Sequence, residues 1–561
     1  MKRLSVLAYL DAPHRDMAAP LLAHLDASGL FELTVVADAG RLADLAQHQV
    51  VLAATGQGPL EAEEEQALCE HVSGGGGLVA LHGTLRAWSG NAGLIELAGG
   101  FVPGEPAPVT ELTVRVADGH GLTQRLDEEF FVVDRLLPAE RVPAGAEKLL
   151  SVPWRYTNQA IAFSREAASG RVVYLGLGGT REAYGNRTFQ QLVLRSLRHA
   201  GGLGDGRRTV GIGLIGYGAI ARDHGRQIEE VAGLELRGVA DLSQARREEA
   251  VRDFESTTAY ATTEALIAEP AIDLVVVGTP PNTHAEVVLQ ALAAGKHVVC
   301  EKPFALQLAD ADRMIALARE RDLTLSVYQS RRWDPDFVAL RQVVDAGVVG
   351  RPFHLESFIG GYGHPCSYWH SHEPISGGTI FDWGSHYFDW TLVLFRERVR
   401  SVSAVAQDRV WFDVTNSDHV AVDVRFEDGR QATFVHSDIA AALKPKWYLL
   451  AERGAIVGRW RRERLGARGT TGELIEDVLA PADSPAELFV HRPNGEGGVS
   501  EEHLALPARV RNGFYRNLAD HLLWGEALAV RPDEARRNVA VMEAAARSIA
   551  KGGTQVDVAD G

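Results

Sequence analysis

Three side chains in the second half of the chain could together move a proton. Asp382 and His386 lie four positions apart, a spacing that puts both on one face of a helix. An imidazole titrates near neutral pH and suits a general base, and a neighbouring carboxylate would orient it. Lys302 follows the apolar run His297–Cys300, at a strand end where α/β proteins bind ligands. We therefore expect Asp382 and His386 to be catalytic, with a helix cap and a buried histidine as the structural alternatives. Lys302 is a third catalytic candidate, but its position alone favours a solvated lysine.

Aromatic and imidazole side chains gather just before the Asp382–His386 pair. They are Tyr362, His364, Tyr368, Trp369, His370 and His372. Rings with polar tips suit stacking on a sugar and hydrogen bonding to its hydroxyl groups, so we expect Tyr362, Trp369, His370 and His372 to bind substrate. The alternative is a metal site, because His370, His372 and His386 with Asp382 have the side-chain types that zinc prefers.

A glycine-rich turn gives the strongest ligand-binding signal. Residues 209–221 read TVGIGLIGYGAIA, an apolar strand that runs into a G-x-G-x-x-A pattern and then a helix. The first glycine allows the tight turn, the second lets a pyrophosphate approach the backbone, and the small third residue permits close helix packing. The pyrophosphate would lie at the helix N-terminus. The expected dinucleotide contacts are Gly216, Tyr217, Gly218, Ala219, Ile220 and Ala221.

The acidic residue Asp241 indicates which dinucleotide is bound. It lies 20 residues after Ala221, at the end of the predicted strand Leu236–Ala240. A carboxylate there can accept a hydrogen bond from a ribose 2′-hydroxyl and would repel a 2′-phosphate. Leu242 and Ser243 follow, rather than an arginine, so the sequence favours NAD over NADP.

The elements that must position these residues fall into two halves. Up to about residue 200, short apolar runs alternate with helical patterns, which indicates a parallel sheet covered by helices. The glycine-rich segment 201–208 then predicts a linker, with a boundary near residue 205. The α/β pattern resumes after it, and polar–apolar alternation from about residue 353 indicates an open antiparallel sheet. Two helices are expected at Gly513–Trp524 and Asp533–Ala550.

Composition excludes several protein classes. The 561 residues are 46% hydrophobic and 23% charged, which is typical of globular domains. A formal net charge of −17 argues against binding nucleic acid or anionic membrane surfaces. The three cysteines, Cys69, Cys300 and Cys366, lie far apart, so we expect no disulfide framework and a cytoplasmic location. We expect no membrane span, and the first apolar run, Leu4–Leu10, is interpreted as a buried strand rather than a signal peptide.

Three motifs of residues 209–561 resemble those of the Gfo/Idh/MocA oxidoreductases. They are the glycine-rich turn, the run GTPPNTHAEVVLQALAAGKHVVCEKPFAL from Gly278, and the segment GGTIFDWGSHYFDW. The resemblance implies a Rossmann domain followed by an open-faced β-sheet domain, an NAD cofactor and no metal. It also assigns catalysis to Asp382 and His386, and implies that Lys302 reaches both the cofactor and the substrate hydroxyl.

Further contacts are expected from the same motifs. The resemblance implies that Glu301 and Gln329 lie near the nicotinamide and that an arginine, Arg332 rather than Arg331, faces the substrate. Thr279 and Asn282, in the loop after the predicted strand Leu274–Val277, are expected to touch the cofactor.

The first 200 residues are similar to ThuA-like domains, which are named for trehalose utilisation and built like class I glutamine amidotransferases. GGGGLVALHG (74–83), DEEFF (127–131) and GRVVYLGLGG (170–179) carry this similarity, although the family often has His where Gly179 stands. An amidotransferase needs a nucleophilic cysteine after the strand Leu78–Leu81, and His82 stands there, so we expect no glutaminase activity. His82 is either a turn residue bonded to the backbone or a contact for a sugar or partner.

Together these features predict a ThuA-like α/β domain over 1–203 and a Rossmann domain over 209–328, then a substrate-binding and oligomerisation sheet domain over 329–510. C-terminal helices, 511–561, are expected to pack back on the oxidoreductase unit.

The expected activity is NAD-dependent oxidation of a secondary hydroxyl of a sugar, glycoside or cyclitol. C3 of a glucoside is favoured, because ThuA-type proteins accompany dehydrogenases that make 3-keto-glucosides. The alternatives are an NAD-dependent glycoside hydrolase or lyase with transient oxidation, and a non-catalytic sugar-sensing protein. We also expect a homo-oligomer, dimer or tetramer, because an open sheet needs covering.

Overall fold

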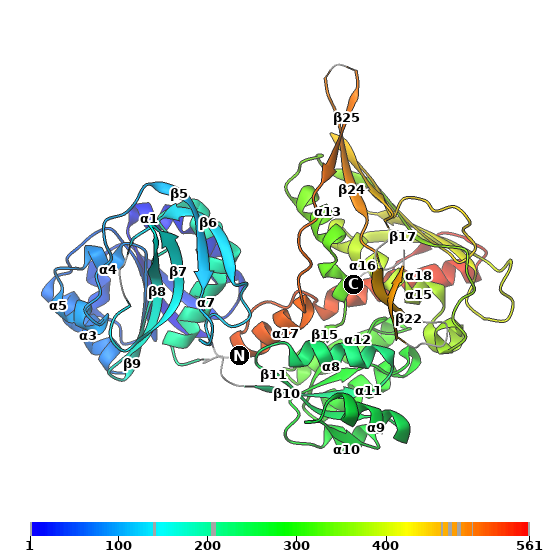
Figure 1. Ribbon diagram of the computed structural model, residues 1–561, viewed down its shortest axis with the longest axis horizontal. Coiled ribbons are helices and arrows are strands. Elements are labelled where there is room, and N and C mark those ends of the chain that lie inside the picture. The colour runs from blue at the N-terminus through cyan, green and yellow to red at the C-terminus, as the bar shows by residue number, and fades with distance from the viewer. Residues whose placement is uncertain are drawn as a thin grey trace. The chain divides into compact units, whose positions relative to one another are not determined.

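The chain folds into two compact units. One consists of Met1–Thr209 with Leu518–Ala527, and the other of Val210–Asn517 with Leu528–Gly561. The structure, a computed structural model, describes residues 3–138, 142–203, 209–461, 464–468, 474–479, 484–495 and 497–558 (Figure 1). Residues 204–208 of the expected linker lie outside the described residues.

The first unit is built on a nine-stranded sheet of order β2-β1-β3-β4-β9-β8-β7-β5-β6. Its parallel part consists of β1 (Leu4–Leu10), β2 (Phe31–Val36), β3 (Val50–Ala54), β4 (Gly77–Leu81) and β9 (Gly170–Leu175). Its antiparallel part consists of β5 (Val109–Val116), β6 (Glu129–Arg135), β7 (Ala146–Trp154) and β8 (Thr157–Ala167). This antiparallel part of the sheet was not predicted from the sequence, because its strands are partly exposed and lack continuous apolar runs.

Helices cover the parallel part of this sheet. The long helices of this unit are α3 (Ala62–Ser73) and α7 (Arg187–Ala200). The short helix α5 (Ala92–Leu97) lies beside α3 (Figure 1). Leu68 and Val72 of α3 pack on Leu7 and Val51 in one buried apolar cluster. The strands are apolar on both faces, as expected for a parallel sheet with helices on both sides.

The segment Leu518–Ala527 belongs to the first unit, although 511–561 was expected to pack on the oxidoreductase unit. It includes the second half of α17 (Gly513–Trp524). The guanidinium of Arg195, fully buried in α7, donates from Nε to Glu526 at 2.7 Å and lies 2.9 Å from Asp520. A buried charge needs such partners, and they come from a segment more than 300 residues away in the sequence.

The second unit begins with a six-stranded parallel sheet of order β12-β11-β10-β13-β14-β15. The strands are β10 (Val210–Ile215), β11 (Leu234–Ala240), β12 (Thr258–Tyr260), β13 (Leu274–Val277), β14 (His297–Cys300) and β15 (Leu325–Val327). The helices between them are α8 (Ala219–Glu229), α9 (Gln244–Asp253), α10 (Thr263–Ile267), α11 (His284–Ala293) and α12 (Leu308–Glu320). The strand order reverses at β10, whose carboxyl end is therefore the position at which such sheets bind ligands.

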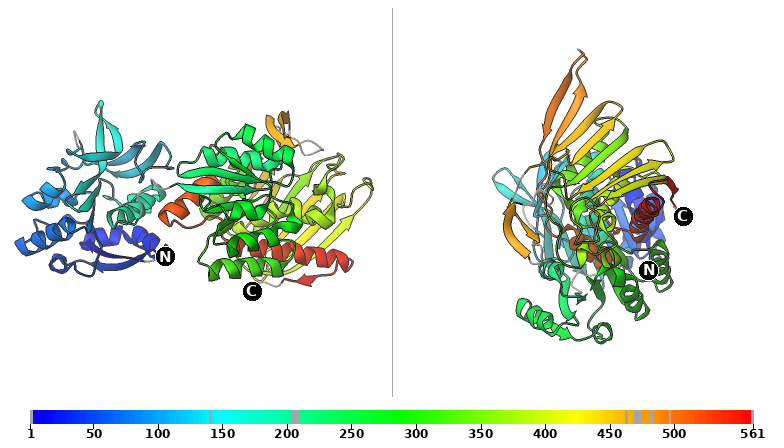
Figure 2. Two further views of the ribbon diagram at one scale, coloured as in Figure 1. Left: turned by 90° about the horizontal axis from the view of Figure 1, so that it is seen from below. Right: turned by 90° about the vertical axis from the view of Figure 1, so that its right-hand side faces the viewer.

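A second sheet of nine strands follows, in the order β25-β24-β21-β20-β16-β19-β18-β17-β26. Its strands are β16 (Pro352–Gly360), β17 (Val399–Gln407), β18 (His419–Phe426), β19 (Gln431–Ser437), β20 (Trp447–Ala451), β21 (Gly454–Arg459), β24 (Glu487–Pro493), β25 (Val499–Leu504) and β26 (Val556–Asp557). All neighbouring pairs are antiparallel except β16 and β19, which run parallel. The helices α16 (Gly384–Leu394) and α18 (Pro532–Ala550) pack together, and α18 lies against β17 (Figures 1 and 2).

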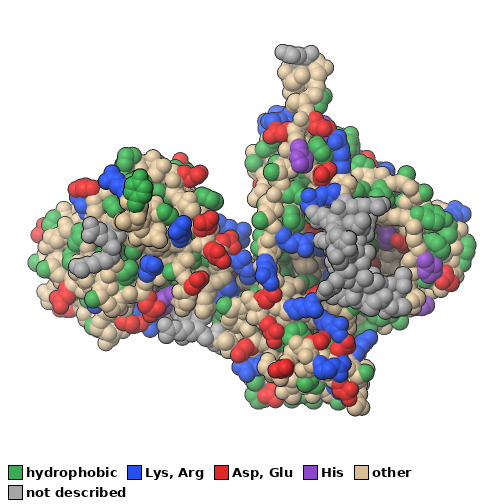
Figure 3. Space-filling model, viewed as in Figure 1, with side chains coloured by type: hydrophobic (Ala, Val, Ile, Leu, Met, Phe, Trp, Pro, Cys, Tyr) green, Lys and Arg blue, Asp and Glu red, His purple; other side chains and the backbone are tan. Residues whose placement is uncertain are grey.

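The surface of each unit is mixed in charge. Acidic and basic side chains are interspersed on the face that Figure 3 shows. Of the helices in the described part of the chain, none is both long and apolar enough to cross a membrane.

Candidate active site

The glycine-rich turn between β10 and α8 has the geometry of an anion-binding site. Gly216 has φ +89°, and a β-carbon there would lie 2.9 Å from the carbonyl oxygen of Gly278, so only glycine fits. Gly218 caps α8 without a side-chain hydrogen bond, and a β-carbon there would meet nothing within 4 Å. Ala221 is buried against the sheet. The first amides of α8 are thus approachable, as binding of a pyrophosphate requires.

Asp241 connects this turn to the end of β11. Its carboxylate accepts hydrogen bonds from the backbone N–H groups of Tyr217, at 2.8 Å, and Ser243, at 2.7 Å. Nη1 of Arg246 lies 3.7 Å from the same carboxylate. This cation was not predicted from the sequence, because the prediction rested on the two residues that follow Asp241. Arg246 lies in α9, and the fold places it beside the end of β11.

A cavity of about 730 Å³ lies within the second unit and is lined by eight of the predicted site residues. The predicted residues that line it are Ile220, Thr279, Glu301, Lys302, Trp369, His370, Asp382 and His386. Asn282, Gln329, Arg332, Tyr362 and His372 are not among its lining residues. The lining also includes residues that sequence reasoning did not assign: Asp223, Gln227, Cys366, Asn416, His436, Asp438 and Arg509.

Lys302 and Asp382 form an ion pair in this cavity. Lys302 Nζ donates to Asp382 Oδ1 at 2.7 Å, and His370 Nδ1 lies 3.5 Å from Oδ2. Burial alone would raise the pKa of Asp382, but the charge of Lys302, with that of His370, holds it well below its ordinary value. Asp382 is therefore an anion that fixes the lysine ammonium at the cavity wall.

His386 is oriented by Gln329 rather than by the expected carboxylate. Asp382 ends α15 (Thr379–Asp382) and His386 lies in the first turn of α16, so the two are not on one continuous helix. Gln329 Nε2 donates to the Ser385 carbonyl at 3.1 Å, so its Oε1, 3.2 Å from His386 Nδ1, accepts a hydrogen bond from the N–H at that nitrogen. Nε2 of His386 then carries the free lone pair.

The protonation state of His386 follows from its surroundings. Burial, followed by the nearby charges of Lys302 and Arg331, holds the pKa of His386 well below its ordinary value. The imidazole is therefore neutral at physiological pH and can accept a proton.

Glu301 is held by a buried chain of hydrogen bonds. Its Oε1 lies 2.9 Å from His224 Nε2, and its Oε2 accepts the backbone N–H of Lys302 at 2.8 Å. The hydroxyl of Tyr515 lies 2.6 Å from His224 Nδ1. Burial would raise the pKa of Glu301, but the bond to His224 and the charge of Lys302 lower it. His224 and Tyr515 carried no sequence signal because neither lies in a recognisable motif.

Of the two adjacent arginines, Arg331 rather than Arg332 reaches the cavity. Arg332 is buried and donates from Nε and Nη2 to the two carboxylate oxygens of Asp389 at 2.7 and 2.6 Å. It also donates to Glu534 at 2.8 Å. The expected substrate role of Arg332 therefore does not fit its position, since its donors tie α16 to α18. Arg331 lines the cavity with its guanidinium over the ring of Trp383.

The aromatic segment is divided between the cavity and the surface. Trp369 and His370 line the cavity with their rings packed together, 4.2 Å between centroids. Tyr362 is 62% exposed and packs on Trp411 outside the lining, and His372 is exposed at the start of a short helix. The described residues contain no group of three or more His, Cys, Asp or Glu placed to hold a metal ion.

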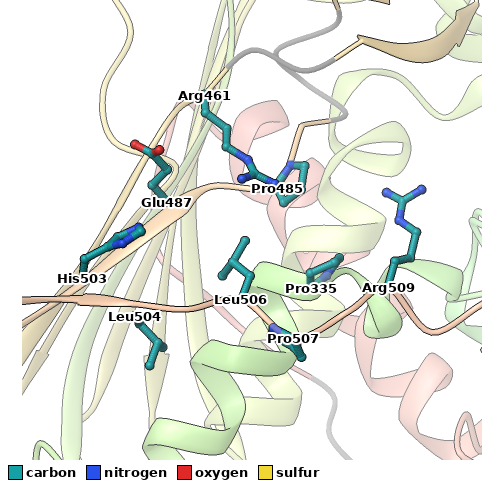
Figure 4. A pocket seen from close by; sticks show the side chains of 9 residues that line it. All are labelled: Pro335, Arg461, Pro485, Glu487, His503, Leu504, Leu506, Pro507 and Arg509. Carbon is teal, nitrogen blue, oxygen red and sulfur yellow. The ribbon is translucent and has the colours of Figure 1, made fainter.

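A smaller cavity of about 390 Å³ lies elsewhere in the second unit. Figure 4 shows its lining, which is largely proline and leucine with Glu487, His503, Arg461 and Arg509. It contains no lysine–carboxylate–imidazole arrangement, so the chemistry belongs to the larger cavity.

Known family models match both units of the chain. Residues 210–329 match the oxidoreductase family model described as an NAD-binding Rossmann fold, and 337–457 match the GFO/IDH/MocA C-terminal domain. Residues 8–200 match the trehalose utilisation model, ThuA.

Individual relatives each match part of this chain. The scyllo-inositol 2-dehydrogenase (NADP(+)) IolW of Bacillus subtilis is 28% identical over 61% of this chain and 95% of its own length. The uncharacterized oxidoreductase YdgJ of Escherichia coli is 30% identical over 56% of this chain and 89% of its own. The chain spans 45% of the length of the uncharacterized oxidoreductase C115.03 of Schizosaccharomyces pombe, at 36% identity. A crystal structure of an NAD-binding protein from Listeria innocua matches 63% of this chain and 98% of its own, at 26% identity and a TM-score of 0.54.

The fold and these similarities define an oxidoreductase that uses a nicotinamide dinucleotide. The chain belongs to the Gfo/Idh/MocA family and carries a ThuA domain in front of its Rossmann domain.

Proposed function

We propose that the protein oxidises a secondary hydroxyl of a sugar, glycoside or cyclitol with NAD as the acceptor. The observation that carries this proposal is that Lys302 and a neutral His386 line the same cavity, next to the glycine-rich turn. The relative IolW is named for oxidation of a cyclitol, scyllo-inositol, which supports a polyhydroxylated substrate.

In the proposed mechanism the chain's own residues move the proton. Bound NAD supplies the hydride acceptor. His386 Nε2 takes the proton of the substrate hydroxyl, while Gln329 keeps Nδ1–H in place. Lys302, held by Asp382, donates a hydrogen bond to the developing alkoxide. The substrate then leaves as a ketone, having lost its hydroxyl proton to the imidazole and a hydride to the cofactor.

NAD is proposed in preference to NADP because Asp241 would repel a 2′-phosphate. The opposing feature is Arg246, 3.7 Å from Asp241 Oδ2, which could pair with such a phosphate. Asp241 already accepts two backbone hydrogen bonds, so it is fixed where a ribose would meet it. The Asp241 side chain is 8% exposed and that of Arg246 is 56% exposed, so the carboxylate is the more fixed of the two charges, which supports NAD.

A glucoside oxidised at C3 is proposed as the substrate, on the grounds of the fused ThuA domain and the rings of Trp369 and His370 at the cavity wall. An absorbance assay of NADH formation over monosaccharides, aryl glucosides, disaccharides and inositols tests the proposal. Preference for a glucoside, with a 3-keto product by mass spectrometry and NMR, supports it. Turnover of inositols alone refutes the glucoside assignment but keeps the dehydrogenase.

The hydrolase or lyase alternative is separated by the same assay. A hydrolase that oxidises its substrate transiently regenerates NAD in each cycle, so the glycosidic bond would be cleaved without net NADH. We further propose a homo-oligomer of cytoplasmic location; sedimentation analysis measures the former and fractionation of the source cells the latter.

A further inference from the structure

The first unit contains a buried cluster of polar side chains that the oxidoreductase chemistry does not use. Its members are His82, directly after β4; Asp134 of β6; Tyr174 of β9; and Tyr184 of α6 (Arg181–Gly185). Their exposed fractions are 8%, 0%, 1% and 0%. Polar groups are stable at such depth only when they have hydrogen-bond partners.

Three polar atoms of this cluster have no such partner. Among the described residues nothing bonds to His82 Nδ1 or to the hydroxyls of Tyr174 and Tyr184. A buried donor or acceptor without a partner loses the hydrogen bonds that it would make to water. Three such atoms in one cluster with Asp134 indicate that another molecule supplies their partners.

Two adjacent glycines bring these groups together. The N–H groups of Gly178 and Gly179 donate to the two oxygens of Asp134 at 2.8 and 2.9 Å. A β-carbon on Gly179 would lie 2.6 Å from His82 Nε2 and 3.0 Å from Asp134 Oδ1. One on Gly178 would lie 3.0 Å from the Tyr184 hydroxyl. These close approaches leave room only for glycine, so the two glycines let an imidazole, a carboxylate and a phenol converge on one stretch of backbone.

The backbone at His82 also indicates a binding site. His82 has φ +46°, a conformation that is strained for a residue with a side chain and that concentrates at functional sites. It lies at the carboxyl end of a parallel strand, the edge at which α/β sheets bind ligands. On the neighbouring strand end, Thr55 donates to Asp11 at 3.0 Å and lines the same edge with polar groups.

The chemistry of the cluster favours an uncharged ligand rich in oxygen. Burial lowers the pKa of His82 to about 4 and raises that of Asp134 to about 6, so at neutral pH the imidazole is neutral and the carboxylate is mostly ionised, which disfavours an anionic ligand. Backbone amides, rather than a lysine or an arginine side chain, hold Asp134. Hydroxyl groups can accept from both tyrosines and donate to the imidazole and the carboxylate.

We propose that the first unit binds a neutral polyhydroxylated molecule at His82, Asp134, Tyr174 and Tyr184. This second site is independent of the proposed dehydrogenase activity, since all its residues belong to the first unit.

Hydrogen–deuterium exchange of the full chain, read by mass spectrometry, tests the proposal. The probes are D-glucose, methyl glucoside and myo-inositol, with gluconate as an anionic polyol of similar size. We expect a neutral probe to slow exchange in peptides covering 77–86 and 174–186, and gluconate not to. Exchange in peptides around Lys302 and His386 reports the dehydrogenase cavity separately, so the two sites can fail independently.

Two variants complete the test. Gly179→Ala places a β-carbon 2.6 Å from His82 Nε2 and so displaces the imidazole, and Tyr184→Phe removes one unpaired hydroxyl. Each should raise the probe concentration for half-protection at least tenfold, and protection around Lys302 and His386 should not change. If Gly179→Ala fails to fold, Tyr184→Phe decides alone. The proposal is overturned if no neutral probe protects these peptides, as buried water alone would give, or if Tyr184→Phe leaves the protection intact.

Discussion

At the scale of single residues, the state of His386 decides how the reaction depends on pH. Its pKa is held well below the ordinary value by burial, with Lys302 and Arg331 adding to the effect. The neutral form is the base, and it is lost only when pH falls through the lowered pKa. We therefore expect kcat/KM to be level through neutrality and to decline only well below pH ~6.5.

The matched variants are His386→Ala and Asp382→Asn. Each should lower turnover by roughly 10²–10⁴ and leave NAD affinity nearly unchanged, because neither group is proposed to hold the dinucleotide. Steady-state rates from pH 4.5 to 9 and NAD titration measure both effects. Near-normal turnover of His386→Ala with an unchanged pH profile would show that another group is the base, Lys302 being the next candidate.

Asp241 and Arg246 give a second prediction at this scale. Asp241→Ser removes the negative charge and keeps a hydroxyl that can accept from the backbone, so the preference for NADH over NADPH should fall about tenfold or more. Adding Arg246→Ala should then weaken the binding of NADPH, because the double variant loses the arginine that could pair with the 2′-phosphate. Dissociation constants by fluorescence titration measure these changes. Tighter binding of NADPH than NADH by the unaltered protein would contradict the role given to Asp241.

At the scale of elements, substitutions of Arg331 and Arg332, the two adjacent arginines after β15, should affect different properties, KM in one case and stability in the other. Arg332 ties α16 to α18 through Asp389 and Glu534, so Arg332→Ala leaves the buried carboxylate of Asp389 unpaired and should destabilise the second unit by about 3–5 kcal/mol. Arg331→Ala should instead change KM with little loss of stability. Denaturant unfolding and steady-state kinetics on both variants separate these roles. Equal stability losses would mean that Arg331 is also structural.

The same elements show what a sequence reveals. The turn at Gly216 and the lysine after β14 could be predicted, because glycine at positive φ and strand-end placement are properties of the local chain. The partner of His386 could not, since Gln329 lies 57 residues away and only the fold brings them together. Likewise the choice between Arg331 and Arg332 depends on which way a short 3-10 turn (Ser330–Trp333) faces. The parallel pair β16–β19 was missed because alternation gives a strand's faces and not its neighbours.

At the scale of the whole molecule, the first unit is completed by a segment from near the other end of the chain. Leu518–Ala527 supplies the carboxylates of Asp520 and Glu526 to the buried Arg195, and Asp520 also accepts from Arg125 at 2.6 Å. Sequence patterns assign these residues to the oxidoreductase unit because a helix so far along the chain follows that unit's last strands. Long-range ion pairs of this kind leave no local signal.

The buried pair predicts that one distant residue controls the stability of the ThuA domain. Glu526→Gln leaves the Arg195 guanidinium in a buried site without one of its two counter-charges. Breaking such a pair costs about 3–5 kcal/mol, which lowers the melting temperature of a unit of this size by on the order of 10 °C. The unfolding transition of the second unit and its affinity for NAD should be unchanged, because the described hydrogen-bond partners of Glu526 belong to the first unit. Glu105→Gln is the matched control: Glu105 pairs with Arg86 at the surface, where an ion pair contributes about 0–1 kcal/mol. Calorimetry of the full chain, with and without NAD, identifies which transition belongs to which unit. A loss of stability in the NAD-sensitive transition alone would show that Glu526 supports the oxidoreductase unit instead.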